Sequence, residues 1–223
     1  IRARDGRAWQ RLRRENVGWL TPWDATSPPQ AESRPRTFPA MVRALHRAAR
    51  LGTGLPFVIE YEGELVGQLN VNNIVRGSAQ FASLGYWIDE GHAGRGLVTR
   101  AVAMAVDHLF FDMGLHRVEI AIRPENRASL RVVEKLELTE IGFAPAYLHI
   151  DGDWRDHRLF AVTREEALWR LLPSARTHSR LHKVREEALL HSGDPRRGAK
   201  VPPRGGGAGE RSPARPPLSF LPE

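Results

Sequence analysis

The sequence predicts an α/β domain in which a mixed, mostly antiparallel sheet is flanked by helices. Three observations predict this fold. Two short apolar runs meet at a Glu-Gly turn and a third run follows them, which is typical of an antiparallel meander. A glycine-rich segment then leads into an amphipathic helix, which crosses to a further strand. Finally, an Asp-Gly pair between two late runs predicts a closing hairpin.

The chain opens with helical patterns. We expect a first helix at about residues 5–16 and a second at about residues 39–51, with the Trp-Leu-Thr-Pro-Trp segment 19–23 between them. The first residues resemble the end of a strand. We therefore expect a short N-terminal piece to precede Ile1.

The meander comprises predicted strands at residues 57–61, 65–71 and 80–88. Beyond the glycines, apolar residues recur at helical spacing, so one face of that helix should pack on the sheet. They are Leu97, Val98, Ala101, Val102, Ala105, Val106 and Leu109. Gly114 should end this helix.

The last elements alternate strand and helix. Residues 116–122 carry apolar side chains on one face and predict a strand. Pro124-Glu125-Asn126 then opens a helix that continues to Leu136. The hairpin joins predicted strands at residues 147–150 and 154–162.

Composition indicates a globular protein and excludes several kinds of site. The chain is 41% hydrophobic and 26% charged, and it contains no run near the roughly 20 apolar residues that a membrane span needs. Without cysteine, disulfides, thiolate metal sites and an acyl-cysteine intermediate are excluded. The nine histidines show no ligand spacing, so we predict no metal site. The lack of cysteine is compatible with a reducing compartment, and we expect a cytoplasmic protein.

The positive charge is concentrated at the C-terminal end. Residues 173–223 hold ten Lys and Arg against five Asp and Glu, which is +5 of the chain's net +7. This segment is rich in Pro, Gly and Arg, so we predict a domain at residues 1–172 and a disordered extension at 173–223. The alternative is a tail that makes weak RNA contacts. The sequence does not indicate an oligomeric state.

The segment Gly91-His92-Ala93-Gly94-Arg95-Gly96 is the strongest functional signal. Glycines let backbone N–H groups approach an anion, and the helix N-terminus that follows adds unpaired donors. A Walker loop would require Gly-Lys-Ser/Thr, and a Rossmann loop would require glycine or alanine at Thr99. A pyrophosphate held by backbone N–H groups fits the spacing. A plain tight turn is the alternative.

Several separate blocks match one family. They are Trp19-Leu20-Thr21-Pro22-Trp23, Asn73-Ile74-Val75-Arg76-Gly77-Ser78, Leu84-Gly85-Tyr86-Trp87-Ile88, Gly94-Arg95-Gly96, Leu115-His116-Arg117, Pro124-Glu125-Asn126-Arg127-Ala128-Ser129 and Ile150-Asp151-Gly152-Asp153-Trp154-Arg155-Asp156-His157. On these blocks the chain resembles the GNAT N-acetyltransferases, and among them the RimJ/RimL type that acetylates N-terminal amines of ribosomal proteins. The resemblance implies the GNAT acyl-CoA N-acyltransferase fold, a splayed sheet and acetyl-CoA as co-substrate.

Two positions depart from the family pattern. Gly91 stands where relatives often have Gln or Arg, which would loosen one contact to the pyrophosphate. Glu137 stands where relatives usually have a glycine that ends a helix. Since Glu adopts the left-handed conformation only at a cost, we expect a local loss of stability there.

The resemblance also implies residues that hold the donor. These are Tyr86, Trp87, Ile88, Gly91, His92, Ala93, Gly94, Arg95, Gly96, Leu97, Val98, Asn126 and Ser129. A backbone N–H of the strand 86–88 would stabilise the oxyanion. Ser129 would protonate the departing thiolate and Asn126 would hold the CoA arm, although both are also common residues at the start of a helix. Tyr147 is the second acid candidate, or an ordinary strand aromatic.

For the acceptor, the matched blocks suggest Asn73, Arg76, Trp19, Trp23, Tyr86 and Asp156. Core packing is the alternative for the tryptophans. Asp156 and His157 are adjacent on a strand, so their side chains should point to opposite faces. One of them would then face the acceptor amine.

The predicted function is transfer of an acetyl group from acetyl-CoA to a protein N-terminus by direct attack in a ternary complex, and the resemblance implies a ribosomal protein as the acceptor. An α-amine with a pKa near ~8 needs less base strength than lysine, which agrees with the lack of an evident base. The alternatives are a GNAT enzyme acting on a small amine, and a non-catalytic acyl-CoA-binding or ribosome-associated factor.

Overall fold

The computed structural model describes residues 1–29, 31, 35, 37–167 and 181–182. It begins with the helical elements η1 (Ala3–Asp5), α1 (Gly6–Glu15), α2 (Val17–Leu20), η2 (Thr21–Trp23) and α3 (Phe38–Arg50). The two predicted helices are therefore confirmed as α1 and α3, with ends within a residue or two of those expected.

The predicted meander is also confirmed. β1 (Leu55–Tyr61), β2 (Glu64–Val75) and β3 (Phe81–Ile88) pair antiparallel in sequence order. Glu62 and Gly63, at the turn between β1 and β2, have φ angles of 51° and 85°. Positive φ at both central residues gives the tight turn that matches the twist of a hairpin.

The crossover follows β3. It passes through η3 (Glu90–His92) into α4 (Leu97–Asp107), which continues as a π-helical turn, η4 (His108–Asp112). Gly114 has a φ of 68° and ends the helical segment, as predicted. All seven residues of the predicted apolar face are buried in the main core or packed against it.

β4 (Arg117–Ile122) runs parallel to β3 and leads to α5 (Arg127–Lys135). A long hairpin of β5 (Thr139–Ile150) and β6 (Asp153–Thr163) follows, turning at the predicted Asp-Gly pair. β5 was expected to start near residue 147 and instead starts at Thr139. Its first residues are almost all exposed, so no alternation of buried and exposed positions marks them in the sequence.

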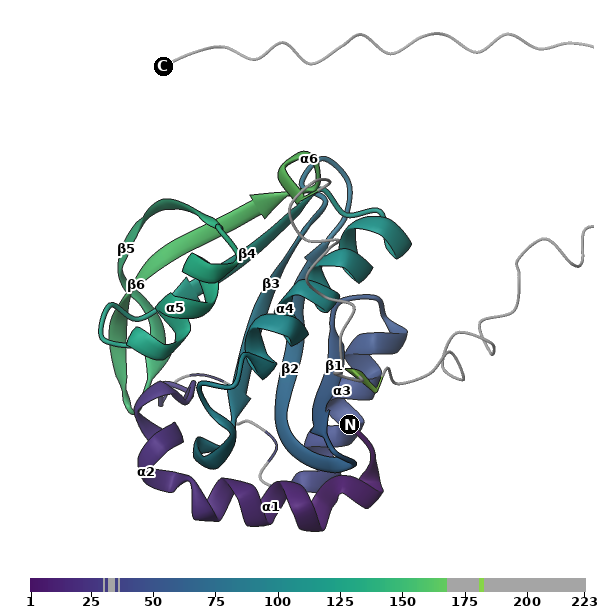
Figure 1. Cartoon of the computed structure of the whole chain (residues 1–223), viewed down its shortest axis with the longest axis vertical. Helices are drawn as coiled ribbons and strands as arrows, with labels where there is room; N and C mark the ends of the chain where they lie inside the picture. Colours follow the sequence, from purple (N-terminus) through teal and green to yellow (C-terminus); the bar gives the residue numbers. More distant parts are fainter. Residues whose placement is uncertain (30, 32–34, 36, 168–180, 183–223) are drawn as a thin grey trace, which may run out of the picture. The chain divides into compact units, whose positions relative to one another are not determined.

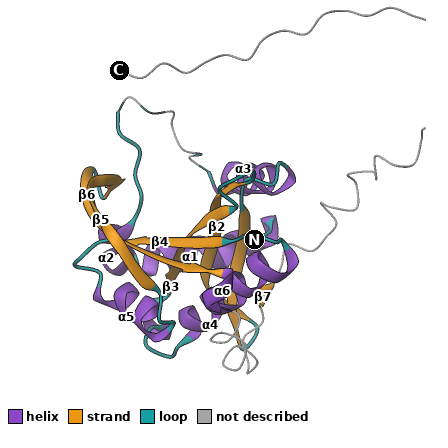
Figure 2. Ribbon diagram, turned by 90° about the horizontal axis from the view of Figure 1, so that it is seen from above, coloured by secondary structure: helices purple, strands orange, loops and turns teal. Residues whose placement is uncertain are grey.

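The final described elements are α6 (Arg164–Ala167) and β7 (Leu181–His182). The strand order is β5-β6-β4-β3-β2-β1-β7. α4 and α5 cover one face of the sheet, while α1 and α3 pack on the other, as Figures 1 and 2 show. The predicted mixed, mostly antiparallel sheet flanked by helices is therefore confirmed.

The expected C-terminal extension, residues 173–223, lies outside the described residues except for β7. The two residues of β7 pair antiparallel with β1 at Val58 and Ile59. Within the described chain, no helix combines the length and apolar character that crossing a membrane would require.

Glu137 has the left-handed conformation that its position in the family pattern implied, with a φ of 53°. Such a residue costs about 1–2 kcal/mol, and glycine's greater freedom in the unfolded chain offsets about half of that. We therefore expect Glu137→Gly to raise the unfolding free energy by about 0.5–1 kcal/mol in urea denaturation. Glu137→Ala, which keeps the strain, should give no such gain. Equal stability of the two variants would show that strain is not the cause.

Candidate active site

β3 and β4 diverge along their length. Their parallel pairing covers only Phe81–Ser83 with Arg117–Glu119, although the two strands continue to Ile88 and Ile122. The splayed sheet implied by the family resemblance is therefore present. Since the later part of β3 has no strand partner on this side among the residues that the structure describes, this edge of β3 is available to an extended ligand.

The glycine loop begins where β3 ends. Gly94 and Gly96 have φ angles of 75° and 76°, which is left-handed backbone that favours glycine. Gly96 is the N-cap of α4, and no side chain of the described residues caps this helix. The first N–H groups of α4 are therefore available to an anion. This geometry fits the pyrophosphate of CoA.

Asn16, a residue that the sequence did not single out, holds the loop in place. It is buried at the end of α1, and its side-chain nitrogen donates to the Asp89 carboxylate (2.7 Å) while its oxygen accepts from the Glu90 N–H (2.8 Å). Burial by itself would raise the pKa of Asp89, but hydrogen bonds from His92 and Asn16 lower it overall. The start of the loop is therefore fixed to α1 by a charged hydrogen-bond network.

Asn126 and Ser129 lie together at the start of α5. Asn126 is the N-cap, and its side-chain oxygen accepts a hydrogen bond from the Ser129 N–H at 3.0 Å. Because the cap uses the Ser129 main chain, the Ser129 hydroxyl is not consumed by it. Asn126 therefore fixes the backbone from which that hydroxyl projects.

Tyr86 of β3 lies near the start of α5. Its hydroxyl is buried and has no hydrogen-bond partner among the described residues. Burial raises the pKa of Tyr86 to about 12, while the neighbouring Ser129 side chain acts in the opposite direction. The Ser129 side chain of α5 is therefore near enough to the Tyr86 hydroxyl to act on its pKa. A buried hydroxyl without a partner is unusual, which makes this a site where a ligand can gain a hydrogen bond.

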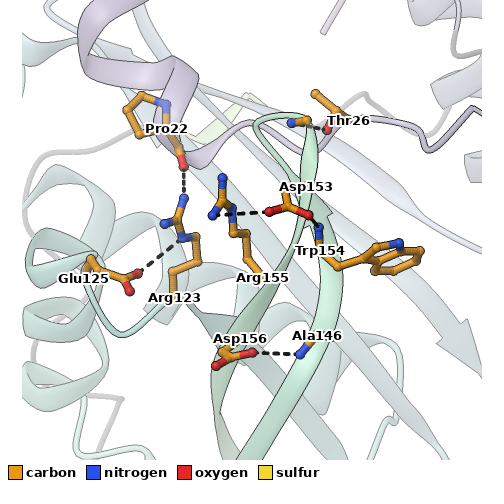
Figure 3. Close-up of polar contacts among 10 residues, drawn as sticks. Pro22, Thr26, Arg123, Glu125, Ala146, Asp153, Trp154, Arg155 and Asp156 are labelled. Carbon is orange, nitrogen blue, oxygen red and sulfur yellow. Dashed lines mark hydrogen bonds and ion pairs between the residues drawn. The ribbon is translucent and has the colours of Figure 1, made fainter.

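The hairpin residues are arranged around a bulge in β5 (Figure 3). The Asp156 carboxylate accepts from the Ala146 N–H at 2.8 Å, and Ala146 has a positive φ of 45°. Tyr147 is exposed, and its ring contacts the buried His157 edge-on. Asp156 is exposed and His157 buried, as predicted for neighbours on a strand. In these contacts Asp156 stabilises the bulge, and Tyr147 is partnered with His157 rather than with Ser129.

His157 predicts a pH dependence of stability. Burial lowers its pKa, and its Nδ1 lies 2.9 Å from the Arg155 carbonyl oxygen. The unfolded chain therefore binds a proton at a pH where the folded chain does not, so stability is full above about pH 6.5 and falls as the pH is lowered. We expect a loss of up to about 1 kcal/mol between pH 6.5 and 5.5 in urea denaturation. His157→Gln should flatten this slope, and an unchanged slope would contradict the assignment.

The predicted acceptor tryptophans make structural contacts on α2 and η2. The Trp19 indole N–H donates to the Ile88 carbonyl at 3.1 Å, which ties α2 to the end of β3. The Arg123 guanidinium lies over the Trp23 ring. It also donates to the Pro22 carbonyl (Figure 3). These tryptophans therefore border the open end of β3 and β4. Their contacts agree with the packing alternative.

Asn73 and Arg76 lie near the paired end of β3, away from the glycine loop. The Asn73 side chain donates to the Ser83 hydroxyl at 3.1 Å, and Arg76 donates to the Met113 carbonyl at 2.8 Å. Asn73 also lines a pocket of about 450 Å³ between the end of α3 and the strands β1 and β2. The structure places neither residue in contact with Ser129.

The splayed strand pair beside an uncapped helix with a glycine loop defines the acyltransferase class that the sequence resembles. The family described as "Acetyltransferase (GNAT) domain" matches residues 2–139. The chain therefore belongs to the GNAT acetyltransferase family and is an N-acetyltransferase. Acetyl-CoA is the acetyl donor of this family.

Curated relatives and solved structures agree with this membership. [Ribosomal protein uS5]-alanine N-acetyltransferase of Escherichia coli K12 is 33% identical over 153 residues, covering 67% of this chain and 77% of the relative. Probable N-acetyltransferase YjcK of Bacillus subtilis 168 is 38% identical over 101 residues, 45% of this chain and only 56% of the relative. The structure of Mycobacterium smegmatis RimJ in complex with CoA-disulfide is 40% identical with a TM-score of 0.69, covering 74% and 80%.

Proposed function

We propose that this protein transfers the acetyl group of acetyl-CoA to the N-terminal α-amine of a protein, and that the acceptor is a ribosomal protein. The observation that carries the proposal is the edge of β3 that β4 leaves open, which leads into the left-handed glycine loop and the N-terminus of α4. The named activity of the uS5-alanine relative supports the acceptor class. The similarity to the RimJ structure with CoA-disulfide supports the donor.

The donor would be held by the loop and by β3. N–H groups at residues 94–98 would bind the pyrophosphate. The edge of β3 at residues 86–88, which pairs with β2 on its other side and is left open by β4, would bind the extended arm and the oxyanion. When bound, acetyl-CoA supplies the acetyl group as a thioester. A ternary complex with direct attack is the route, since no cysteine is present to carry the acetyl group.

Ser129 is proposed to donate a hydrogen bond, and finally a proton, to the departing sulfur. Its backbone is fixed by the Asn126 cap, and its hydroxyl lies at the opening beside Tyr86. Tyr147 is the weaker candidate because its ring contacts His157. The acceptor needs little base strength, because an α-amine with a pKa near ~8 is partly neutral at physiological pH.

The test is thiol release from acetyl-CoA with the N-terminal peptide of ribosomal protein uS5 and with peptides that begin with Ala, Ser or Met. The same peptides with an acetylated N-terminus are the matched controls, and spermidine tests the small-amine class. We expect turnover only on free peptide N-termini. Turnover on spermidine with none on any peptide would contradict the proposal.

A further inference from the structure

A chain of three side chains links α1 to β2 beside the opening. The Trp9 indole N–H donates to Gln68 Oε1 at 2.8 Å, and Gln68 Nε2 donates to Asn70 Oδ1 at 2.8 Å. Since indole can only donate, Gln68 must present its oxygen to Trp9 and its nitrogen to Asn70. The carboxamide of Asn70 is thereby oriented, with its oxygen occupied and its nitrogen free of any donor bond to the described residues.

Asn70 lies on the face opposite Ser129. Its neighbours Leu69 and Val71 are buried under α4, so Asn70 faces the side covered by α1 and α3. It pairs with Gly85 of β3, within the segment that has left β4. The next residue, Tyr86, points to the other face and packs against the main core under α4. Asn70 therefore stands across β3 from the place where the thiolate is expected.

Gly85 leaves the space above β3 open. A Cβ added at Gly85 would meet only the Asn72 side-chain nitrogen, at 3.7 Å. Asn70 is half-buried, and Gln68 behind it is buried with 3% of its surface exposed. Asn70 stands opposite this uncovered position in the register of β2 and β3, and the buried Gln68 supports its carboxamide. Such preorganised donors bind a ligand oxygen at low entropic cost.

We propose that the Asn70 carboxamide nitrogen donates a hydrogen bond to the first main-chain carbonyl oxygen of the acceptor peptide. This inference rests on the proposed function and names how the enzyme selects that acceptor. A peptide N-terminus carries a carbonyl two bonds from its amine nitrogen, whereas a polyamine carries none. An oriented donor therefore favours peptides, because it would stay unpaired against a polyamine.

The test replaces Asn70 with Asp. Aspartate keeps an oxygen toward Gln68 and removes the outward N–H donor, so the relay stays intact. The two acceptors are an Ala-initiated peptide and its isostere, in which a trans carbon–carbon double bond replaces the first peptide bond. We expect the native enzyme to prefer the peptide by about tenfold or more in kcat/KM, compared at equal concentrations of neutral amine.

In Asn70→Asp the peptide should lose about tenfold or more in kcat/KM and the isostere less than threefold, with the KM for acetyl-CoA and the Tm unchanged. Trp9→Phe, which lets Gln68 rotate, should give a smaller loss on the peptide only. Gln10→Glu, on the exposed side of α1, is the matched control and should change nothing.

Two outcomes separate the inference from the proposed function. Equal losses on both acceptors, or a carbonyl preference that survives in Asn70→Asp, would overturn the role of Asn70 and leave peptide acetylation standing. Turnover of spermidine without turnover of any peptide would overturn the proposed function and this inference with it.

Discussion

Replacing Ser129 with alanine should lower kcat by roughly 100-fold while the KM for acetyl-CoA changes less than threefold. General acid groups contribute about 10²–10⁴-fold to a rate, and a serine that hydrogen-bonds the sulfur belongs at the low end because its own pKa is high. The cap should survive, since Asn126 accepts from the Ser129 main-chain N–H. Steady-state kinetics with an Ala-initiated peptide measures both constants.

The Tm of Ser129→Ala and the kcat of a second variant, Tyr147→Phe, show whether a loss of kcat reports the role of the Ser129 hydroxyl. The Tm of Ser129→Ala should lie within about 2 °C of the native value, because Ser129 is half-buried and its hydroxyl contributes little to the free energy of unfolding. Tyr147→Phe removes the other hydroxyl considered as an acid and should change kcat less than threefold. If Tyr147→Phe is the slower of the two variants, the roles of Ser129 and Tyr147 are reversed.

Much of the fold could be predicted because its signals are local. The meander, the crossover and the late hairpin each depend on turn chemistry and apolar periodicity, which neighbouring residues determine. The start of β5 at Thr139 was missed because its exposed residues carry no periodicity. The left-handed conformation of Glu137 was predicted because relatives usually have a helix-ending glycine at this position, and its φ of 53° agrees.

The site was harder to predict because its contacts join distant segments. The glycine loop and the Asn126 cap are local patterns and were visible in the sequence. The proximity of Tyr86 to Ser129 depends on how β3 and α5 are placed by the sheet. The only sequence signal for Asn16 is a polar residue at the end of a helix, which is also where ordinary caps occur.

Replacing Asn16 with alanine should lower the unfolding free energy by about 2–4 kcal/mol and raise the KM for acetyl-CoA by roughly tenfold. Asn16 is 4% exposed, and its side chain makes three hydrogen bonds within the described part of the chain, to the Leu12 carbonyl, the Asp89 carboxylate and the Glu90 N–H. Its loss leaves a partly buried carboxylate with one donor fewer and an N–H without a partner, which costs more than the bonds themselves contribute. Urea denaturation and acetyl-CoA titration measure the two effects.

The aspartate variant separates loss of packing from loss of the donor. Asn16→Asp keeps the shape of the side chain and can still accept from the Glu90 N–H. It replaces the side-chain nitrogen, which lies 2.7 Å from the Asp89 carboxylate, with a second carboxylate oxygen. Repulsion should raise the pKa of Asp89 and make this isosteric variant at least as unstable as Asn16→Ala at pH 7.5. Lowering the pH toward 5 should then reduce the difference in unfolding free energy between Asn16→Asp and the native protein, since protonation of one carboxyl restores a donor. An aspartate variant as stable as the native chain would show that shape, rather than the donated hydrogen bond, holds the loop.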